Sequence, residues 1–277
     1  MEPFILQQQP IPYFTIPSWT ALMPSLSVGF TSRKGGRSTD EYRSMNMALH
    51  VNDKEEDVIY NRKLLASLTG FPYDAWTNAE QVHGDRVEVV TLNHKGKGRL
   101  QQDDAISGTD GLVTDTPGIL LTSFYADCVP LYFFDPEKKA VGLAHAGWKG
   151  TVLKIAEKMI ETMNYSFGSD PEHIKVAIGP SIGQCCYEVN EDVIQPLKKT
   201  ISMIPEDAII DKQKGHYDLD LKKINQEIVI YAGIKPQNIE ISSWCTSCHT
   251  EWFYSHRKEK GKTGRMASWI GLRKDEV

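Results

Sequence analysis

The sequence predicts an α/β sandwich with a mixed sheet, folded as a single domain. The chain has 277 residues, of which 40% are hydrophobic and 24% charged, a composition and length that allow a globular protein to bury a sizeable core. Short runs of β-branched and aromatic residues, punctuated by Gly, Pro and Asp, indicate strands. No repeat, low-complexity tract or long linker interrupts them, so residues 1–277 are expected to form one domain.

The elements are expected in the following order. A strand at residues 27–31 runs into a loop rich in Gly, Ser and Arg, and a helix covers residues 52–70, with Asn52 or Asp53 as its N-cap and Gly70 at its end. Strands follow at 85–91, 110–114, 118–127, 129–135 and 139–147. Several of these are apolar at consecutive positions, which indicates a sheet covered on both faces. The remaining elements are a helix at 148–163, a strand at 174–180, helices near 190–198 and 218–232, and strands at 238–242 and 266–272.

Charge and composition exclude several classes of protein. The formal net charge is −5 and the sequence pI is about 5.9, which argues against a nucleic-acid binder, because such proteins carry a basic face. No stretch reaches the roughly 18 to 20 uncharged apolar residues of a membrane helix, and the first ten residues lack the features of a signal peptide. We therefore expect a soluble, cytoplasmic protein that does not bind membranes. Its five cysteines then suit reduced thiols or metal ligands better than disulfides.

Three side chains that can bind a metal or act in catalysis stand at the ends of strand-like runs. His83 lies in EQVHG, Cys128 in YADCVP and His145 in LAHAG, and each is followed within two residues by Gly or Pro. Strand ends of α/β folds converge on a crevice, where such folds keep their sites. Gly147 lets the chain turn after His145, and Trp148 and Lys149 begin the following helix, in which Trp148 is expected to pack rather than bind.

This set supports two kinds of chemistry, and the residues alone do not choose between them. Two imidazoles and a thiolate form a three-ligand zinc site with a fourth position open for water or substrate. Without a metal, the same residues form a Cys-His nucleophile pair with a second histidine as orienter or acid. A single His or Cys at a strand end is usually packed or exposed without function, but three at equivalent ends favour a site. Asp127, a carboxylate directly before Cys128, is costly to bury unpaired and is expected to face solvent or a neighbouring polar group.

The other four cysteines are expected to be reduced structural thiols. WCTSCH at 244–249 fits the haem-attachment pattern CxxCH, but such attachment belongs to exported proteins. A zinc knuckle on Cys245 and Cys248 would need a second ligand pair of similar spacing. Cys185 and Cys186 are poor partners for it, because neighbouring strand residues point to opposite faces.

Two basic, glycine-rich loops complete the candidate site. TSRKGGRS groups Arg33, Lys34 and Arg37 around two glycines, and the segment from Arg257 to Arg265 is similar. Backbone amides with an arginine can hold an oxyanion or a phosphate. GKT at 261–263 is not a P-loop, because the glycine required five residues earlier is His256.

The sequence resembles the family variously called YfiH-like, laccase-domain or multicopper polyphenol oxidase proteins, in its short bacterial form. The matching motifs, in order between about residues 27 and 271, are TSRKGGRS, NMALHVND, EQVHGDRV, GTDGLVT, YADCVPL, AHAGWKGT, GPSIGQCCYEV, WCT and FYSHR with GKTGR. The resemblance implies an α/β sandwich, similar also to a deamidating toxin with a Cys-His active site. It implies that His83, Cys128 and His145 bind a catalytic metal, normally assigned to zinc and in older descriptions to copper.

The resemblance also implies an activity on purine nucleosides. Family members are described as phosphorylases of adenosine, inosine, guanosine and S-methyl-5′-thioadenosine that also deaminate adenosine. Arg33 in the family's Arg-x-Gly-Gly position and Asn46 in its Asn-Met/Leu position are expected to bind substrate. Where some relatives have tyrosine, this chain has His256.

In the hypothesis for deamination, a water activated by the metal attacks C6 of the purine, and Asp127 carries the proton. Arg33 and the neighbouring glycine amides hold phosphate for phosphorolysis. Three alternatives stay open: a copper phenol oxidase, a Cys-dependent amidase that edits cell-wall precursors, and a metal-stabilised binding protein without activity. A single set of three ligands argues against the oxidase, because the reduction of oxygen by four electrons requires several coppers.

Overall fold

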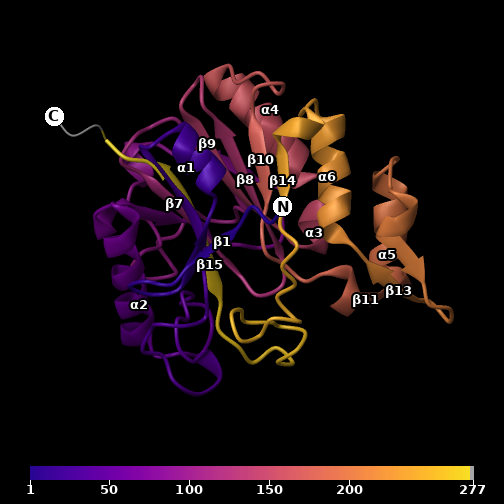
Figure 1. Cartoon of the computed structure of the whole chain (residues 1–277), viewed down its shortest axis with the longest axis horizontal. Helices are drawn as coiled ribbons and strands as arrows, with labels where there is room; N and C mark the ends of the chain where they lie inside the picture. The colour runs from indigo at the N-terminus through magenta and orange to yellow at the C-terminus, as the bar shows by residue number, and fades with distance from the viewer. Residues whose placement is uncertain (275–277) are drawn as a thin grey trace.

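Two six-stranded sheets packed face to face form the centre of this computed structural model, which describes residues 1–274 (Figure 1). The first sheet has the order β1 (Ile5–Gln7), β2 (Tyr13–Thr15), β3 (Leu26–Thr31), β15 (Met266–Leu272), β7 (Leu120–Tyr125) and β4 (Trp76–Asn78). The second has the order β14 (Ile239–Ile241), β10 (Lys175–Ile178), β8 (Val129–Asp135), β9 (Ala140–Ala146), β6 (Gly111–Thr114) and β5 (Val87–Val89). Both sheets are mixed: the pairs β4–β7, β10–β14 and β5–β6 are parallel, and the others are antiparallel.

Helices cover the outer faces of both sheets. Helix α2 (Glu55–Thr69) lies beside the first sheet, and the second sheet is covered by α3 (Trp148–Val152), α4 (Ile155–Phe167) and α6 (Leu221–Tyr231) (Figure 1). The short helix α1 (Pro17–Leu22) contacts β3. The predicted α/β sandwich is therefore confirmed, although its strands form two large sheets rather than one. None of the helices in residues 1–274 is long and apolar enough to cross a membrane.

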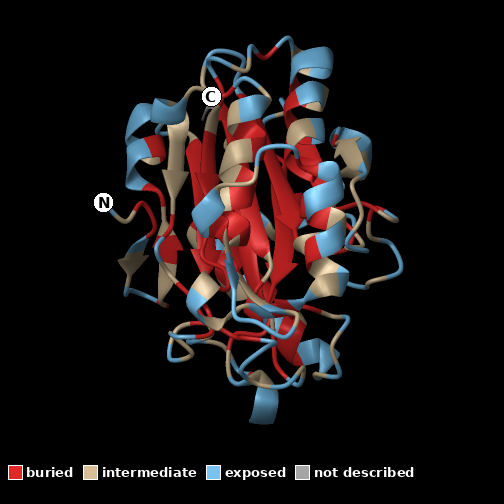
Figure 2. Cartoon of the chain, turned by 90° about the vertical axis from the view of Figure 1, so that its right-hand side faces the viewer, coloured by how far each residue is buried: buried red, intermediate tan, exposed pale blue. Residues whose placement is uncertain are grey.

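The side chains alternate between two apolar cores, as the consecutive apolar residues of the predicted strands require. From β8, Tyr132 and Phe134 point between the two sheets, whereas Leu131 and Phe133 point toward the helices of the second sheet. Both sets are fully buried, and Figure 2 shows the strands of this sheet as buried behind helices whose outer sides are exposed. Burial on both faces explains why these strands lack the alternation of apolar and polar residues that a half-exposed strand shows.

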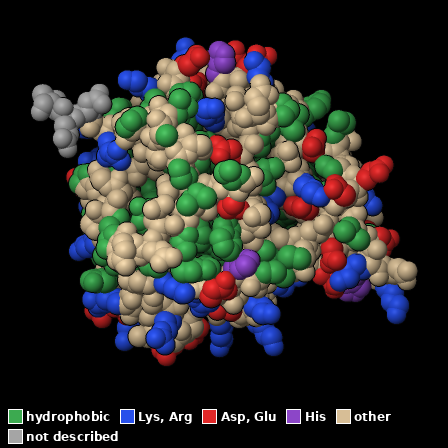
Figure 3. Space-filling model, viewed as in Figure 1, with side chains coloured by type: hydrophobic (Ala, Val, Ile, Leu, Met, Phe, Trp, Pro, Cys, Tyr) green, Lys and Arg blue, Asp and Glu red, His purple; other side chains and the backbone are tan. Residues whose placement is uncertain are grey.

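A small extension projects from this sandwich. It consists of β11 (Glu188–Asn190), β13 (His216–Leu219) and β12 (Ile209–Asp211), in that order in a third sheet, and of α5 (Glu191–Thr200). The space-filling view is hollowed between the extension and the main body, and acidic and basic side chains are interspersed over the face that it shows (Figure 3).

Two details of the helices differ from the sequence prediction. The helix expected over 148–163 is divided into α3 and α4, because Lys154 has a left-handed conformation with φ of 57°, which a right-handed helix cannot contain. Helix α2 begins at Glu55 with Lys54 as its N-cap, and Gly70 ends it in the left-handed conformation as expected. The predicted cap residue Asp53 instead accepts hydrogen bonds from the backbone of Lys54 and from the side chain of Asn46.

Candidate functional site

Two of the predicted site residues lie at the same end of one hairpin. Cys128 directly precedes β8, and His145 is the penultimate residue of β9. The two strands pair antiparallel with Pro130 opposite His145, so that the start of one strand meets the end of the other. His145 and Leu143 are two residues apart in β9, so their side chains lie on the same face of the sheet. Leu143 belongs to the core between the two sheets, and the His145 side chain therefore points toward that space.

The third residue, His83, reaches the same point from a loop. It follows β4 and precedes β5, and it has the left-handed backbone conformation, with φ of 59°. Its Nε2 lies 3.9 Å from Cys128 Sγ, and its ring centre lies 4.7 Å from that of His145. One ligand atom from each of the three residues lies within 4.8 Å of the others. His83 is exposed, Cys128 half-buried and His145 buried, so the group opens to solvent on one side.

Asp110, which the sequence reasoning missed, holds two of these residues in place. It directly precedes β6 and is buried. Its Oδ1 accepts hydrogen bonds from His145 Nδ1 at 2.8 Å and from the His83 backbone at 3.1 Å. Its Oδ2 accepts from the backbones of Val82 at 3.1 Å and Gly84 at 2.8 Å. Occupation of His145 Nδ1 leaves Nε2 as the free ligand atom of this imidazole, an arrangement common around metal-binding histidines.

The close packing of these groups changes their protonation. Burial by itself would raise the pKa of the Cys128 thiol, but the charge of His145 and hydrogen bonds with both histidines lower it to about 6. Burial by itself would lower the pKa of His145, but the Cys128 thiolate and Asp110 raise it to about 9. Without a metal, residues 128 and 145 therefore form a thiolate–imidazolium pair at neutral pH.

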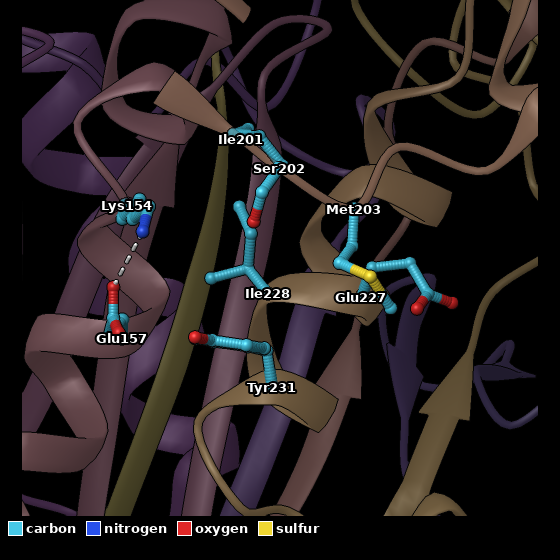
Figure 4. A pocket seen from close by; sticks show the side chains of 8 residues that line it. All are labelled: Lys154, Glu157, Ile201, Ser202, Met203, Glu227, Ile228 and Tyr231. Carbon is cyan, nitrogen blue, oxygen red and sulfur yellow. Dashed lines mark ion pairs between the residues drawn. The ribbon is translucent and has the colours of Figure 1, made fainter. Parts of the chain in front are cut away.

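Two of the three residues, His83 and Cys128, line a pocket of about 450 Å³, and the buried His145 adjoins them without lining it. Among the residues that line this pocket are His83, Asp127, Cys128, Lys149, Arg257 and Arg265. A volume of this size accommodates a small molecule such as a nucleoside. A hollow elsewhere, between α4, α6 and residues 201–203, has about 20 Å³, enough for little more than a water molecule, and contains one ion pair, between Lys154 and Glu157 (Figure 4).

Asp127 lines the pocket but is held by three hydrogen bonds. Its carboxylate accepts from Thr246 Oγ1 at 2.6 Å, from Ser255 Oγ at 3.1 Å and from the backbone of Arg257 at 2.7 Å. The prediction that it faces a neighbouring polar group is confirmed. The three donors come from two segments, at Thr246 and at residues 255–257, so the carboxylate joins both of them to the start of β8.

The two residues expected to bind substrate do not line this pocket. Arg33 pairs with Glu259 at 3.0 Å, donates to the backbone oxygen of Thr250, and lies 4.5 Å from the ring centre of Tyr254. It lines a different depression, on the side of the basic loop. Arg33 therefore lies outside the pocket at the three-residue group, and its guanidinium group joins two loops.

Asn46 is fully buried and supports the pocket from behind. Its Oδ1 accepts from the backbones of Ala48 and Arg265, and its Nδ2 donates to Asp53. Asn46 therefore positions Arg265, which does line the pocket, instead of touching the pocket itself.

Arg265, Arg257 and Lys149 are the basic groups that the structure brings to the site. The two arginines bound the second glycine-rich loop of the sequence, and Lys149 lies in α3, directly after the turn at Gly147. Within residues 1–274, none of the three forms an ion pair with a carboxylate. Their charges are therefore not neutralised by an acidic side chain, and both arginines also donate to backbone oxygens.

Comparisons with known proteins agree with this description. Residues 27–273 match the family model of the multi-copper polyphenol oxidoreductase laccase. The chain is 40% identical over 245 residues to the purine nucleoside phosphorylase YlmD of Bacillus subtilis, covering 88% of each chain. It is 43% identical over 249 residues to the protein of the same name from Geobacillus stearothermophilus, covering 89% of this chain and 90% of the relative.

A solved structure shares the fold throughout. The crystal structure of the Bacillus licheniformis hypothetical protein YfiH superposes with a TM-score of 0.93 at 41% identity, covering 97% of this chain and 99% of the other. The chain therefore belongs to the multi-copper polyphenol oxidoreductase laccase family.

Proposed function

We propose that this protein is a zinc-dependent purine nucleoside phosphorylase that also deaminates adenosine. The observation that carries the proposal is that His83, Cys128 and His145 come together at a pocket of nucleoside size, in a chain whose relatives are named purine nucleoside phosphorylases. The proposed substrates are adenosine, inosine, guanosine and S-methyl-5′-thioadenosine, used with phosphate in the cytoplasm. Residues 1–277 act as one domain in this proposal.

The donor set fits zinc. Two imidazoles and one thiolate satisfy three of its positions, and the exposed side of the group leaves the fourth open. When bound there, zinc supplies Lewis acidity and an activated water. Copper would also accept these ligands, but one group of three residues holds one ion.

The basic side chains of the pocket are assigned to phosphate. In phosphorolysis a phosphate oxygen forms a bond to ribose C1′ while the bond from C1′ to the purine nitrogen breaks, and the base leaves with a proton. Arg257, Arg265 and Lys149 can hold the phosphate anion during this exchange. Tyr187 and Trp148, which also line the pocket, offer aromatic faces for the purine. Arg33, the residue first expected to bind phosphate, is not assigned this role.

We assign Asp127 to positioning rather than to proton transfer. A carboxylate that accepts three hydrogen bonds is suited to fixing the pocket wall around Cys128 and Arg257. We assign Asn46 a similar role behind Arg265.

The test follows adenosine by chromatography, with and without phosphate, using protein of measured metal content. We expect adenine and ribose 1-phosphate in the presence of phosphate, and inosine and ammonia in its absence. His83→Ala should lose both reactions, whereas His173→Ala, at an exposed histidine paired with Glu137, should keep them. Unchanged nucleosides in protein loaded with zinc, or full activity in His83→Ala, would refute the proposal.

A second candidate is a Cys-dependent amidase, which the thiolate–imidazolium pair of Cys128 and His145 favours. This activity would survive removal of the metal, because the thiolate itself is the nucleophile. Release of an amino acid from a cell-wall peptide by the metal-free protein, with nucleosides unchanged, would support it. Oxidation of a phenol after loading with copper, measured on the same preparation, would instead support the oxidase for which the family is named.

A further inference from the structure

The four cysteines outside the site described above also come together, from two segments about 60 residues apart. Cys185 and Cys186 end a short 3-10 helix (Gln184–Cys186), and Cys245 and Cys248 lie in the loop after β14. The sequence reasoning that set Cys185 and Cys186 on opposite faces is wrong, because residues 184–186 form a helical turn and not a strand. In such a tight turn, two neighbouring side chains can face the same point.

The distances within this four-cysteine cluster match those of a metal site. The Sγ atoms of Cys185 and Cys186 lie 3.8 Å apart, and Cys248 Sγ lies 3.6 Å and 3.4 Å from them. All four sulfur atoms, including that of Cys245, lie within 4.8 Å of one another. Sulfur atoms on a tetrahedron with zinc–sulfur bonds of about 2.3 Å are separated by about 3.8 Å. A disulfide needs about 2.05 Å and joins only two sulfurs, whereas this cluster brings four thiols to one point.

The backbone around the cluster is arranged to support thiolates. The N–H of Gly183 donates to Cys245 Sγ at 3.2 Å. A Cβ atom at Gly183 would lie 3.2 Å from Cys245 Cβ and 3.3 Å from Cys185 Sγ, closer than most such contacts, so the two segments approach at a residue without a side chain. Ser181 and Cys245 are joined by a parallel bridge, which includes a hydrogen bond from Thr246 N to Ser181 O.

A buried cation fixes the second segment. Lys222 is 8% exposed, and its Nζ donates to the backbone oxygens of Ser242 at 2.8 Å and Trp244 at 3.2 Å. Its positive charge therefore lies next to the carbonyl of Trp244, the residue before Cys245. A positive charge there favours a site with net negative charge, and four thiolates around a divalent cation form such a site.

We propose that Cys185, Cys186, Cys245 and Cys248 bind a second zinc ion, in a closed, four-thiolate structural site. Four protein ligands leave no position for a substrate, which distinguishes this site from the three-ligand group. The ion would clamp together two segments that build the pocket. Ile182 and Tyr187 of the first segment line the pocket, and Thr246 of the second holds Asp127 by a hydrogen bond of 2.6 Å.

The test counts zinc in protein purified without chelator and under nitrogen. We expect two zinc ions per chain in the unaltered protein, one in Cys128→Ala, one in Cys248→Ser and none in the double variant. Because Cys248 is exposed, its replacement by serine is not expected to prevent folding, and circular dichroism checks this. The count does not depend on the nucleoside reaction, so loss of the second ion and failure of the proposed activity are separate results.

A second measurement covers the case in which Cys248→Ser does not fold. Cys128→Ala, which retains all four cysteines of the cluster, is refolded with Co²⁺ in place of zinc. We expect the strong sulfur-to-cobalt absorption and the visible bands of a tetrahedral four-thiolate site. One zinc per chain that disappears in Cys128→Ala alone, no cobalt–thiolate absorption in that variant, or a disulfide between two of the four cysteines in the nitrogen-purified protein would each overturn the proposal.

Discussion

Replacement of Asp110 by asparagine should weaken both the fold and the proposed metal site. Each carboxylate oxygen of Asp110 accepts two hydrogen bonds: Oδ1 from His145 Nδ1 and the His83 backbone, and Oδ2 from the backbones of Val82 and Gly84. Asparagine is nearly the same shape but replaces one oxygen by an NH₂ group. At the Oδ2 position the NH₂ group faces two backbone donors, which it cannot satisfy. At the Oδ1 position it faces the His83 backbone N–H and His145 Nδ1, and the imidazole can accept there only by moving its proton to Nε2.

The magnitude follows from the number of donors left without an acceptor. A buried donor that loses its partner costs about 1–3 kcal/mol. One or two donors lose their acceptor and the backbone bonds are partly buried, so the free energy of unfolding should fall by about 1–4 kcal/mol. The imidazole of His145 also loses the charged partner that orients it. Loss of such a partner typically weakens metal binding by about 10- to 100-fold.

The assays are urea unfolding of the metal-free protein and competition for zinc against a coloured chelator. Asp115→Asn is the matched control, because Asp115 lies at the other end of the same strand, β6, and is exposed. It should leave the free energy of unfolding within about 0.5 kcal/mol of the original value. If Asp110→Asn behaved like this control in both assays, the positioning role derived for Asp110 would be wrong.

Three further outcomes are expected. In the metal-free protein, the rate at which iodoacetamide alkylates Cys128, followed by peptide mapping, should stop rising above pH about 7, because the pKa of its thiol is about 6. The alkylation rate of an ordinary thiol of pKa about 8.5 would still rise nearly tenfold per pH unit there. Such a rise would contradict the ion pair of Cys128 with His145. Gly147→Ala should reduce zinc retention, because its Cβ would lie 3.1 Å from both Cys128 Sγ and Cδ2 of His83. Gly84→Ala is the control, because its Cβ makes contacts of 3.4 Å or more. Equal zinc retention by the two variants would contradict the reasoning from crowding. Arg62→Met should lower the free energy of unfolding by about 2–5 kcal/mol, since this buried guanidinium donates to three backbone oxygens. Urea unfolding measures the loss, with Lys63→Met at an exposed position as the control. Equal stability of the two variants would refute the prediction.

The sequence predicts those parts of the molecule that are encoded locally. The apolar runs of β7, β8 and β9 identify strands buried on both faces, and the glycine or proline after each predicted site residue marks where a strand or loop must turn. Because such ends gather at one edge of a fold, the residues His83, Cys128 and His145 can be selected before any coordinates exist.

What the sequence does not reveal depends on contacts between distant segments. Asp110 precedes a strand, as many surface aspartates do, and only its burial against residues 82–84 and His145 shows its role. Arg33 and Arg265 stand in similar glycine-rich loops, and only the fold decides that one pairs with Glu259 while the other enters the pocket. The cysteines at 185 and 186 were misplaced because strand alternation was applied to a helical turn.

The pairing of β8 with β9 has a consequence for how the protein matures. Cys128 and His145 are brought together by the alignment that sets Pro130 opposite His145. A shift of one residue between the two strands would turn the imidazole to the opposite side of the sheet. A chain that folds with such an error would separate Cys128 from His145, so binding of the proposed zinc ion would stabilise only the correctly aligned molecules.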